Sequence, residues 1–472
     1  MRIVSTATST TRRRFLRDVA AGAGALAASA TLFDLAGCAP EAQAGVRTPG
    51  AGEKLRIGLV GVGGKGKSNL EGVLKTGEEV IALCDVDATK IDEAVKIAAA
   101  FPHARRYRDY REMIAKEAEL QAVVVSTPDH MHAPVAMAAL SRGMHVYCEK
   151  PLTRTVWESR RLRELSARNG LATQMGNQGS ASGDMRHGIE IVRAGLIGTV
   201  REVHAWTNRP IWPQGMERPV GADDIPATLN WDGWLGVAAE RPFKKDVYHT
   251  FKWRGWHAFG AGAFGDMGCH TLNLPFRALE LSDPHEVEAV STSDHMSETF
   301  PKSSTVRFAF AARGALPERT LWWYDGGVKP ALERIPEAVR ARGELGGSGL
   351  VLVGDAGVIY SDDDYNTKLW IALKGEAKLV KASDHPAATA VAATLPRAAK
   401  GHYQEWIDAC RGGPTTFSSF AVASKLAETC ILGTIAQQVP GRKLAWDAEA
   451  MRFADADAQA LVKPNYRPGW AI

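Results

Sequence analysis

The sequence predicts an α/β protein whose first domain is a doubly wound parallel sheet. Four short apolar runs alternate with segments of helical pattern, the runs being 55–62, 79–86, 121–127 and 145–149. Runs this short and this continuously apolar are typical of parallel strands buried on both faces. The helical segments are 88–100, 111–119, 133–142 and 156–169, and an extended segment follows at 171–176. This alternation, with a glycine-rich turn after the first run, indicates a doubly wound sheet.

Composition and charge narrow the class of protein. The chain has 472 residues, of which 45% are hydrophobic and 23% charged, as in ordinary globular proteins. This length favours two or three domains. The net charge is +4, and residues 1–37 carry +3 of it, so no basic stripe is left for a nucleic acid. We therefore expect no nucleic-acid partner.

The N-terminus has the pattern of an export signal. A twin-arginine stretch at 11–17 precedes an apolar run at 19–33, which is short for a membrane span. Leu35-Ala36-Gly37-Cys38 is similar to a lipidation site. We predict a signal peptide over 1–37 and a flexible linker over 38–54. Export then leads to the periplasm or to a lipid anchor at Cys38, the expected contact with a membrane.

The turn after the first strand matches two phosphate-binding patterns. Gly61, Gly63 and Gly66 form G-x-G-x-x-G, while 61–68 also matches the Walker pattern of nucleotide triphosphatases. Both patterns place backbone N–H groups at phosphates. Asp85 ends the second strand, 24 residues beyond Gly61, where it would accept hydrogen bonds from ribose hydroxyls. That strand follows too soon for a Walker acid, so a dinucleotide is favoured. Because an acid repels a 2′-phosphate, NAD is favoured over NADP.

Two further strand ends carry a family resemblance. They are Ser126-Thr127-Pro128-Asp129-His130-Met131-His132 and Glu149-Lys150-Pro151. Together with the glycine turn they resemble the Gfo/Idh/MocA oxidoreductases over roughly residues 55–470. The resemblance implies a Rossmann domain, predicted over 55–176, and a substrate-binding α/β domain with an open, mostly antiparallel sheet, predicted over 177–472. It also implies a homo-oligomer formed through that sheet.

The resemblance further implies roles for the strand-end residues. Cofactor contacts fall on Thr127, Pro128, His132, Glu149 and Lys150, and Lys150 also matches the family's substrate-contacting lysine. An ammonium group at that position would stabilise a developing alkoxide and relay a proton. His130 is expected to have a structural role, stabilising the loop and capping the start of the helix.

Asp266 and His270 are the candidate catalytic pair of the second domain. They are four residues apart, so on a helix they share a face. A carboxylate beside an imidazole raises its basicity, which suits a histidine that takes a hydroxyl proton. Spacing alone also fits a helix-capping acid and an unreactive histidine. The segment resembles the family's D-x-G-x-H pattern, which implies a position opposite the nicotinamide.

Substrate contacts are predicted among aromatic and polar residues. Twelve of the 13 tryptophans follow residue 200, and Trp253 and Trp256 are the first candidates to stack on a sugar. Four polar residues are further candidates, although each fits an ordinary surface role equally well: Gln178, Arg186, His187 and Arg254. No metal site is expected, because the six cysteines include no C-x-x-C pair. The segment 466–470 (YRPGW) suggests no function.

These observations predict an NAD-dependent oxidoreductase acting on a hydroxyl of a sugar or glycoside. Outside the cytoplasm little NAD is available for exchange, so the cofactor would be tightly bound and regenerated in each cycle. An NAD-dependent glycosidase that oxidises its substrate transiently fits as well. A carbohydrate-binding lipoprotein without catalysis is a third interpretation.

Overall fold

The computed structural model describes residues 52–470 except 295, together with residues 45, 47, 49 and 50. The predicted signal peptide, Cys38 and most of the predicted linker lie outside the described residues. Within the described part, no helix is long and apolar enough to cross a membrane. No group of three or more candidate metal ligands occurs there either.

The first sheet is parallel and has six strands in the order β3-β2-β1-β4-β5-β6. Its strands are β1 (Arg56–Val60), β2 (Glu79–Cys84), β3 (Arg105–Tyr107), β4 (Ala122–Val125), β5 (His145–Cys148) and β6 (Thr173–Met175). The helices between them are α1 (Lys65–Leu74), α2 (Ala88–Ile97), α3 (Tyr110–Lys116), α4 (His132–Ser141) and α5 (Val156–Asn169). The predicted doubly wound sheet is confirmed. Strand order reverses between β1 and β4, and a crevice opens there at the strands' carboxyl ends.

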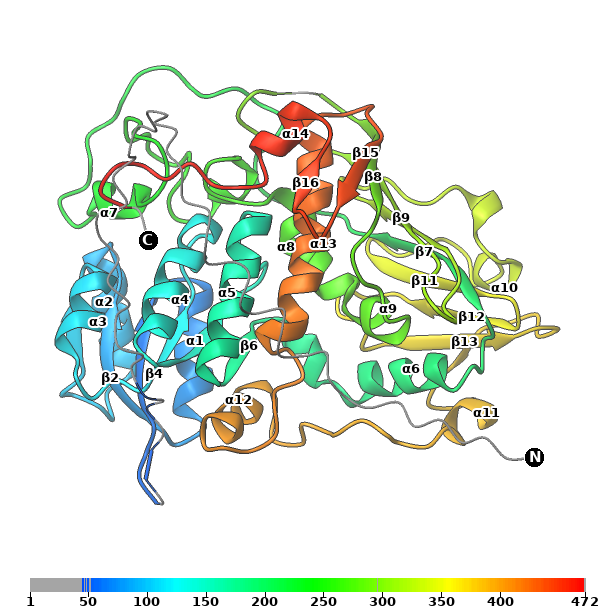
Figure 1. The fold of residues 1–472 in the computed structure, drawn as a ribbon, viewed down its shortest axis with the longest axis horizontal. Coiled ribbons are helices and arrows are strands. Elements are labelled where there is room, and N and C mark those ends of the chain that lie inside the picture. Colours follow the sequence, from blue (N-terminus) through cyan, green and yellow to red (C-terminus); the bar gives the residue numbers. More distant parts are fainter. Residues whose placement is uncertain (1–44, 46, 48, 51, 295, 471–472) are drawn as a thin grey trace, which may run out of the picture. The chain divides into compact units, whose positions relative to one another are not determined.

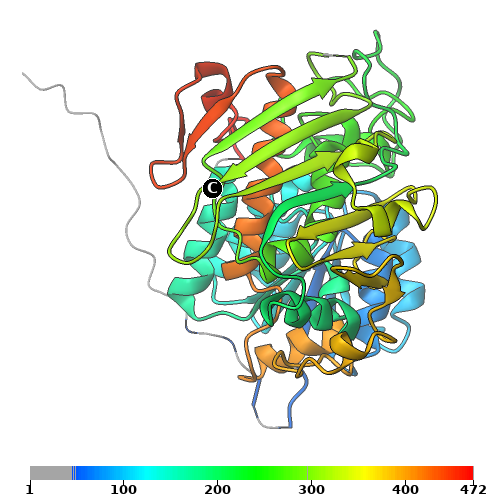
Figure 2. The ribbon, with the colours of Figure 1, turned by 90° about the vertical axis from the view of Figure 1, so that its right-hand side faces the viewer.

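The second sheet is mixed and has ten strands in the order β14-β13-β12-β11-β7-β10-β9-β8-β15-β16. The central members are β7 (Val200–Trp206), β8 (Glu286–Thr292), β9 (Ser304–Phe310), β10 (Arg319–Tyr324) and β11 (Gly349–Gly354). The outer members are β12 (Gly357–Ser361), β13 (Leu369–Leu373), β14 (Val380–Lys381), β15 (Leu444–Asp447) and β16 (Arg452–Phe453). β7 and β10 pair in parallel and the other neighbours are antiparallel. The expected open, mostly antiparallel sheet is confirmed (Figure 2).

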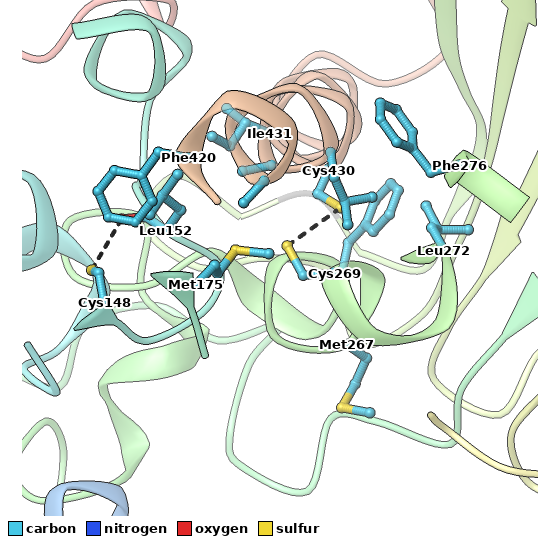
Figure 3. Close-up of a cluster of buried hydrophobic side chains, with 14 of the residues drawn as sticks. Cys148, Leu152, Met175, Met267, Cys269, Leu272, Phe276, Phe420, Cys430 and Ile431 are labelled. Carbon is cyan, nitrogen blue, oxygen red and sulfur yellow. Dashed lines mark hydrogen bonds between the residues drawn. The ribbon is translucent and has the colours of Figure 1, made fainter. Parts of the chain in front are cut away.

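The long helix α13 (Phe420–Gln438) joins the two sheets. It packs against α5 on one side and against α8 (Gly262–Thr271) and β8 on the other (Figure 1). Figure 3 shows side chains of α13 meeting those of α8, including Cys269 and Cys430, whose sulfur atoms lie 3.9 Å apart. The five described cysteines are buried free thiols. A continuous apolar core therefore supports α8, which carries two candidate site residues.

The remaining described helices are shorter than α13. They are α6 (Gly183–Arg193), α7 (Trp231–Leu235), α9 (Asn273–Ala278), α10 (Glu337–Arg340), α11 (Pro386–Thr389), α12 (His402–Cys410) and α14 (Ala456–Ala460), with short 3₁₀ turns that include η1 (Asp129–Met131), η2 (Gln178–Ala181) and η3 (Lys252–Gly255). α12 returns to the first domain, where Trp406, Ile407 and Cys410 pack in the core beneath that sheet.

Candidate active site

A cavity of about 640 Å³ lies at the carboxyl ends of the first sheet's strands. One wall comes from the segments after β1, β2, β4 and β5. The other comes from residues 230–254, from Asp266 on α8 and from Trp470. The cavity therefore combines the predicted dinucleotide site with residues far along the chain.

The glycine turn leaves room that a side chain would fill. Gly61 has φ +79°, and a Cβ there would lie 2.7 Å from the carbonyl carbon of Ser126. A Cβ on Gly66 would lie 1.9 Å from the carbonyl oxygen of Gly61. No side chain caps the start of α1 at Gly64. The first amides of α1 are thus left for a phosphate group. Lys67, the lysine of the Walker pattern, is exposed and does not line the cavity.

Asp85 holds the same turn from β2. Its Oδ2 accepts hydrogen bonds from the amides of Val62 (2.9 Å) and Gly63 (3.4 Å), and its Oδ1 accepts one from Asp87 (3.0 Å). Burial raises the pKa of Asp85, although these amides act against the shift. Of the nearby cations, Lys90 pairs with Glu93 and Arg108 donates to two backbone carbonyls. An acid at this place, with cations already paired, suits a ribose hydroxyl better than a 2′-phosphate.

The predicted contacts after β4 border the same cavity. Thr127, Pro128 and His132 line it, and the Thr127 hydroxyl is buried without a hydrogen-bond partner. Burial lowers the pKa of His132 to about 4, so its neutral ring donates from Nε2 to the Thr127 carbonyl at 2.9 Å. A polar cofactor bound at the glycine turn, here called the glycine cradle (Gly61, Gly63 and Gly66), could supply the missing hydrogen-bond partner of this hydroxyl.

Glu149 lies at the end of β5 and also borders the cavity. Its Oε1 accepts hydrogen bonds from Asn69 and Gln178, both at 3.0 Å, while its Oε2 is buried without a partner. Gln178, on η2, also donates to the Tyr147 hydroxyl at 2.9 Å. Gln178 therefore positions a cofactor-side carboxylate, and it does not line the cavity as a substrate contact would.

Lys150, Asp266 and Arg254 form an ion cluster on the cavity wall. Lys150 Nζ donates to Asp266 Oδ1 at 2.6 Å and to its carbonyl oxygen at 2.8 Å, and Arg254 Nε lies 3.3 Å from the same Oδ1. Burial by itself would raise the pKa of Asp266, but Lys150 and Arg254 outweigh it and lower that pKa to about 2. Asp266 is therefore ionised and holds Lys150 toward the cavity.

His270 lies one helical turn after Asp266, is 5% exposed and is not among the residues that line the cavity. Burial, aided by Lys150, lowers its pKa well below the usual value, so the imidazole is neutral. Its Nδ1 is buried without a hydrogen-bond partner, and its ring meets Tyr365 edge-on at 4.7 Å. Among the described residues, the carboxylate of Asp266 accepts hydrogen bonds from Lys150 and Arg254 and none from His270.

Besides Gln178, three predicted substrate contacts lie away from the cavity. Arg186 is fully buried on α6, where it donates to the Ser180 and Pro396 carbonyls and to Glu405. His187 bonds the Ala388 carbonyl. Trp256 is 1% exposed and packs among Tyr248 and other aromatic side chains. Their side chains make contacts within the fold and are not among those that line the cavity.

Trp253 and Arg254 do line the cavity, next to Phe251. The guanidinium carbon of Arg254 lies 4.3 Å from the Trp253 ring centre and 4.5 Å from that of Phe251. Phe251 is 43% exposed, and no motif in the sequence marks it as a site residue. The three residues form a flat, partly cationic surface beside the ion cluster.

Asp129 is a second carboxyl group that the sequence analysis passed over. It follows Thr127-Pro128, lines the cavity and is 5% exposed. Burial raises its pKa to about 7, although Arg254 and Lys150 act in the opposite direction. Its neighbour His130 packs against Phe259 and bonds the Trp234 carbonyl, as a structural role requires. The available signal was an acid at the carboxyl end of a central parallel strand.

Family models match both parts of the chain. One describes an oxidoreductase family with an NAD-binding Rossmann fold and covers residues 55–177. The other describes the C-terminal α/β domain of the same family and covers residues 190–302. The chain carries both domains of the Gfo/Idh/MocA oxidoreductase family. The glycine cradle, the uncapped start of α1 and the Thr127 hydroxyl are what its NAD-binding domain requires.

Relatives within this family differ in what their names describe. Inositol 2-dehydrogenase of Salmonella typhimurium is 35% identical over 118 residues, which are 25% of this chain and 34% of the relative. A glycosyl hydrolase family 109 protein of Shewanella amazonensis is 30% identical over 213 residues, covering 40% of this chain and 43% of that protein. The chain thus spans less than half the length of these Gfo/Idh/MocA relatives.

Solved structures support the fold over a larger share of the chain. The WlbA dehydrogenase of Chromobacterium violaceum, in complex with NADH and UDP-GlcNAcA, has a TM-score of 0.60 at 16% identity, covering 85% of this chain and 99% of the other. Levoglucosan dehydrogenase with NADH and levoglucosan gives 0.54 at 16% identity, covering 82% and 98%. At such identities the likeness shows the fold.

Proposed function

We propose that this protein is an NAD-dependent oxidoreductase that acts on a hydroxyl group of a sugar or glycoside and regenerates its bound NAD(H) within each cycle. The observation that carries the proposal is the Lys150–Asp266–Arg254 cluster, which faces the same cavity as the glycine cradle. A charged amine beside a dinucleotide site suits a reaction in which an alkoxide develops. The inositol 2-dehydrogenase relatives support a polyhydroxylated substrate.

The ion cluster defines the reaction centre. When bound, NAD supplies the hydride acceptor. Lys150, fixed by Asp266, donates a hydrogen bond to the reacting oxygen and stabilises its negative charge.

His270 is the proposed acceptor of the hydroxyl proton. Its ring is neutral, and its Nδ1 has no protein partner. A neutral imidazole has a lone pair that can accept a proton, and a substrate oxygen that reached this nitrogen would give it its missing partner. Trp253 and Phe251 offer apolar faces to the sugar ring, and Arg254 offers donors to its hydroxyls.

Export would explain why the cofactor must be recycled. The twin-arginine pattern and Cys38 support a proposed location in the periplasm or at the cell envelope, where little NAD is available for exchange. A dehydrogenase that released NADH there would stop after one turnover. Reduction of a second sugar, or of an external acceptor, would restore NAD in place.

A glycosidase is the second candidate, favoured by the family 109 relatives. In the glycosidase reaction, oxidation at a ring carbon such as C3 acidifies the neighbouring C–H bond. The glycosidic oxygen is then eliminated, water adds to the double bond, and the ring carbon is reduced back. The two candidates share the first step and differ in the product.

The test is a glycoside screen with the protein as purified, analysed by mass spectrometry. The dehydrogenase predicts a product two hydrogen atoms lighter than the substrate. The glycosidase predicts release of an unchanged reducing sugar. A protein that binds sugars and yields neither product would contradict the proposal and indicate a binding protein.

The variant Lys150→Ala tests the role of this lysine in the reaction. It is expected to lower turnover by at least about a hundredfold, as loss of a proton-transfer or charge-stabilising group does, and to retain NAD. Lys67→Ala is the matched control, since that lysine is exposed and outside the cavity. Undiminished turnover in Lys150→Ala would remove Lys150 from the mechanism.

A further inference from the structure

Trp470 borders the dinucleotide cavity although it lies more than 200 residues beyond the other lining residues. It is 9% exposed and packs with Met131 and Val237, next to Tyr110. The guanidinium carbon of Arg111 lies 4.1 Å from the centre of its ring. The indole is thus fixed by its surroundings, and part of its surface is left to the cavity.

The position of Trp470 is at the adenosine end of the cavity. Asp85, the expected ribose contact, follows β2, and Tyr110 starts the helix after β3, the neighbouring strand. The ion cluster at Lys150 follows β5, on the other side of the central strands β1 and β4. A base attached to a ribose at Asp85 would therefore lie toward Tyr110, Met131 and Trp470.

The tail that carries Trp470 is tied down at several points. The Arg467 amide donates to the Val237 carbonyl at 3.0 Å, and its side chain donates to the Gly236 carbonyl (3.0 Å) and to Asp232 (2.6 Å). The Tyr466 hydroxyl donates to Glu158, at the start of α5. These bonds join the tail to α7 and to the first domain. The tail is therefore part of the cavity wall.

A second segment encloses the same end. His249 Nε2 lies 3.0 Å from Asp87 Oδ2, the Ala88 amide donates to the Thr228 carbonyl, and the Asn230 amide donates to the Val86 carbonyl. The loop after β2 is thus bonded to residues 228–249. An adenosine bound here would have chain on both sides.

We infer that Trp470 stacks on the adenine base of the dinucleotide and that the tail 466–470 slows release of the cofactor. The inference rests on the dinucleotide site of the proposed function and adds a residue that binds the base. Aromatic stacking on a base changes affinity by about tenfold to a hundredfold when the ring is removed. Such a contact would help an exported enzyme to keep its NAD.

The test measures binding of ADP-ribose by calorimetry and the release rate of NADH by fluorescence during a chase with excess NAD. In the full-length protein freed of nucleotide, Trp470→Ala is expected to weaken ADP-ribose binding by about tenfold to a hundredfold and to speed NADH release similarly. Trp470→Phe keeps a ring and should stay near the wild type. Trp470→Leu keeps apolar packing against Met131 and Val237 without a ring, and should behave like Trp470→Ala.

Lys463→Ala is the control within the same tail, because its ammonium lies over Trp157, 5.2 Å from the ring centre and away from the cavity. It should leave both measurements unchanged. If Trp470→Leu bound ADP-ribose and released NADH as the wild type does, apolar packing alone would explain the role of Trp470, and stacking would be overturned. Unchanged ADP-ribose binding in Trp470→Ala would overturn stacking as well. A wild type that binds no ADP-ribose would overturn both this inference and the proposed function. If the Trp470 variants differ from the wild type in ADP-ribose binding as expected, but the wild type does not turn over any glycoside, the proposed function alone would be overturned.

Discussion

The pKa values of two carboxyl groups in one cavity are shifted in opposite directions. Asp266 is ionised because two cations hold its pKa at about 2, whereas burial raises the pKa of Asp129 to about 7. Environments that separate the pKa values of two neighbouring titratable groups are typical of sites that transfer protons. Asp129 is thus the residue of this cavity that gains or loses a proton near neutral pH.

Burial of Asp129 predicts a pH-dependent stability. Between its ordinary pKa near 3.8 and about 7, the folded protein binds more protons at this group than the unfolded chain does. The wild type therefore loses unfolding free energy as pH rises through this window, by up to about 1.4 kcal/mol per pH unit. Asp129→Asn lacks this contribution. Urea unfolding at pH 5, 6 and 7 should show that the unfolding free energy of the variant rises relative to that of the wild type as the pH increases. An equal pH dependence of the two unfolding free energies would contradict the raised pKa of Asp129.

Local motifs made part of the site predictable. The glycines, Asp85 and the residues after β4 and β5 act where the chain leaves a strand, so their neighbours in sequence set their positions. Asp129 follows β4 as well, but the burial that raises its pKa comes from segments that meet only in the folded chain. The positions of Phe251 and Trp470 at the cavity depend on such segments too. For the same reason, nothing near Arg186 or Trp256 in sequence shows that their side chains point into the core.

At the scale of elements, local signals decided which boundaries could be predicted. The helix over 156–169 has the predicted ends because Thr155 and Glu158 form a capping box and Gly170, at φ 61°, ends it. β3 was missed because two of its three residues are exposed arginines. The outer strands of the second sheet were not located, since their pairing joins distant segments.

Close packing of α13 on α8 gives a prediction for Gly433. A Cβ there would lie 2.0 Å from Phe264 Cε1 and 2.9 Å from Phe308 Cζ. Phe264 is stacked on Trp323 at 4.4 Å and has little freedom to move. Gly433→Ala should therefore lower the unfolding free energy by about 1–3 kcal/mol. Gly183→Ala, whose Cβ would meet nothing within 4 Å, is the control for urea unfolding; equal effects would refute the packing argument.

For the whole molecule, the cavity depends on segments from nearly the full length of the described chain. The cofactor wall comes from the first sheet, while the opposite wall comes from 230–254, α8 and the tail. The predicted homo-oligomer through the open sheet stays a prediction, which light scattering would test against a monomeric mass.

Export is a prediction at this scale as well. Replacing Arg12 and Arg13 by lysine should keep the protein in the cytoplasm, because the twin-arginine pattern is lost. Cys38→Ala should move it from the membrane to the soluble fraction of the envelope. Cell fractionation would show both, and a wild type found in the cytosol would contradict them.

The proposed function requires that this protein holds its own NAD. The direct measurement is to purify the protein without added nucleotide, denature it, and identify what is released by mass and absorbance. The account predicts NAD(H) in an amount close to that of the protein. A folded protein that releases no nucleotide would contradict a retained and recycled cofactor.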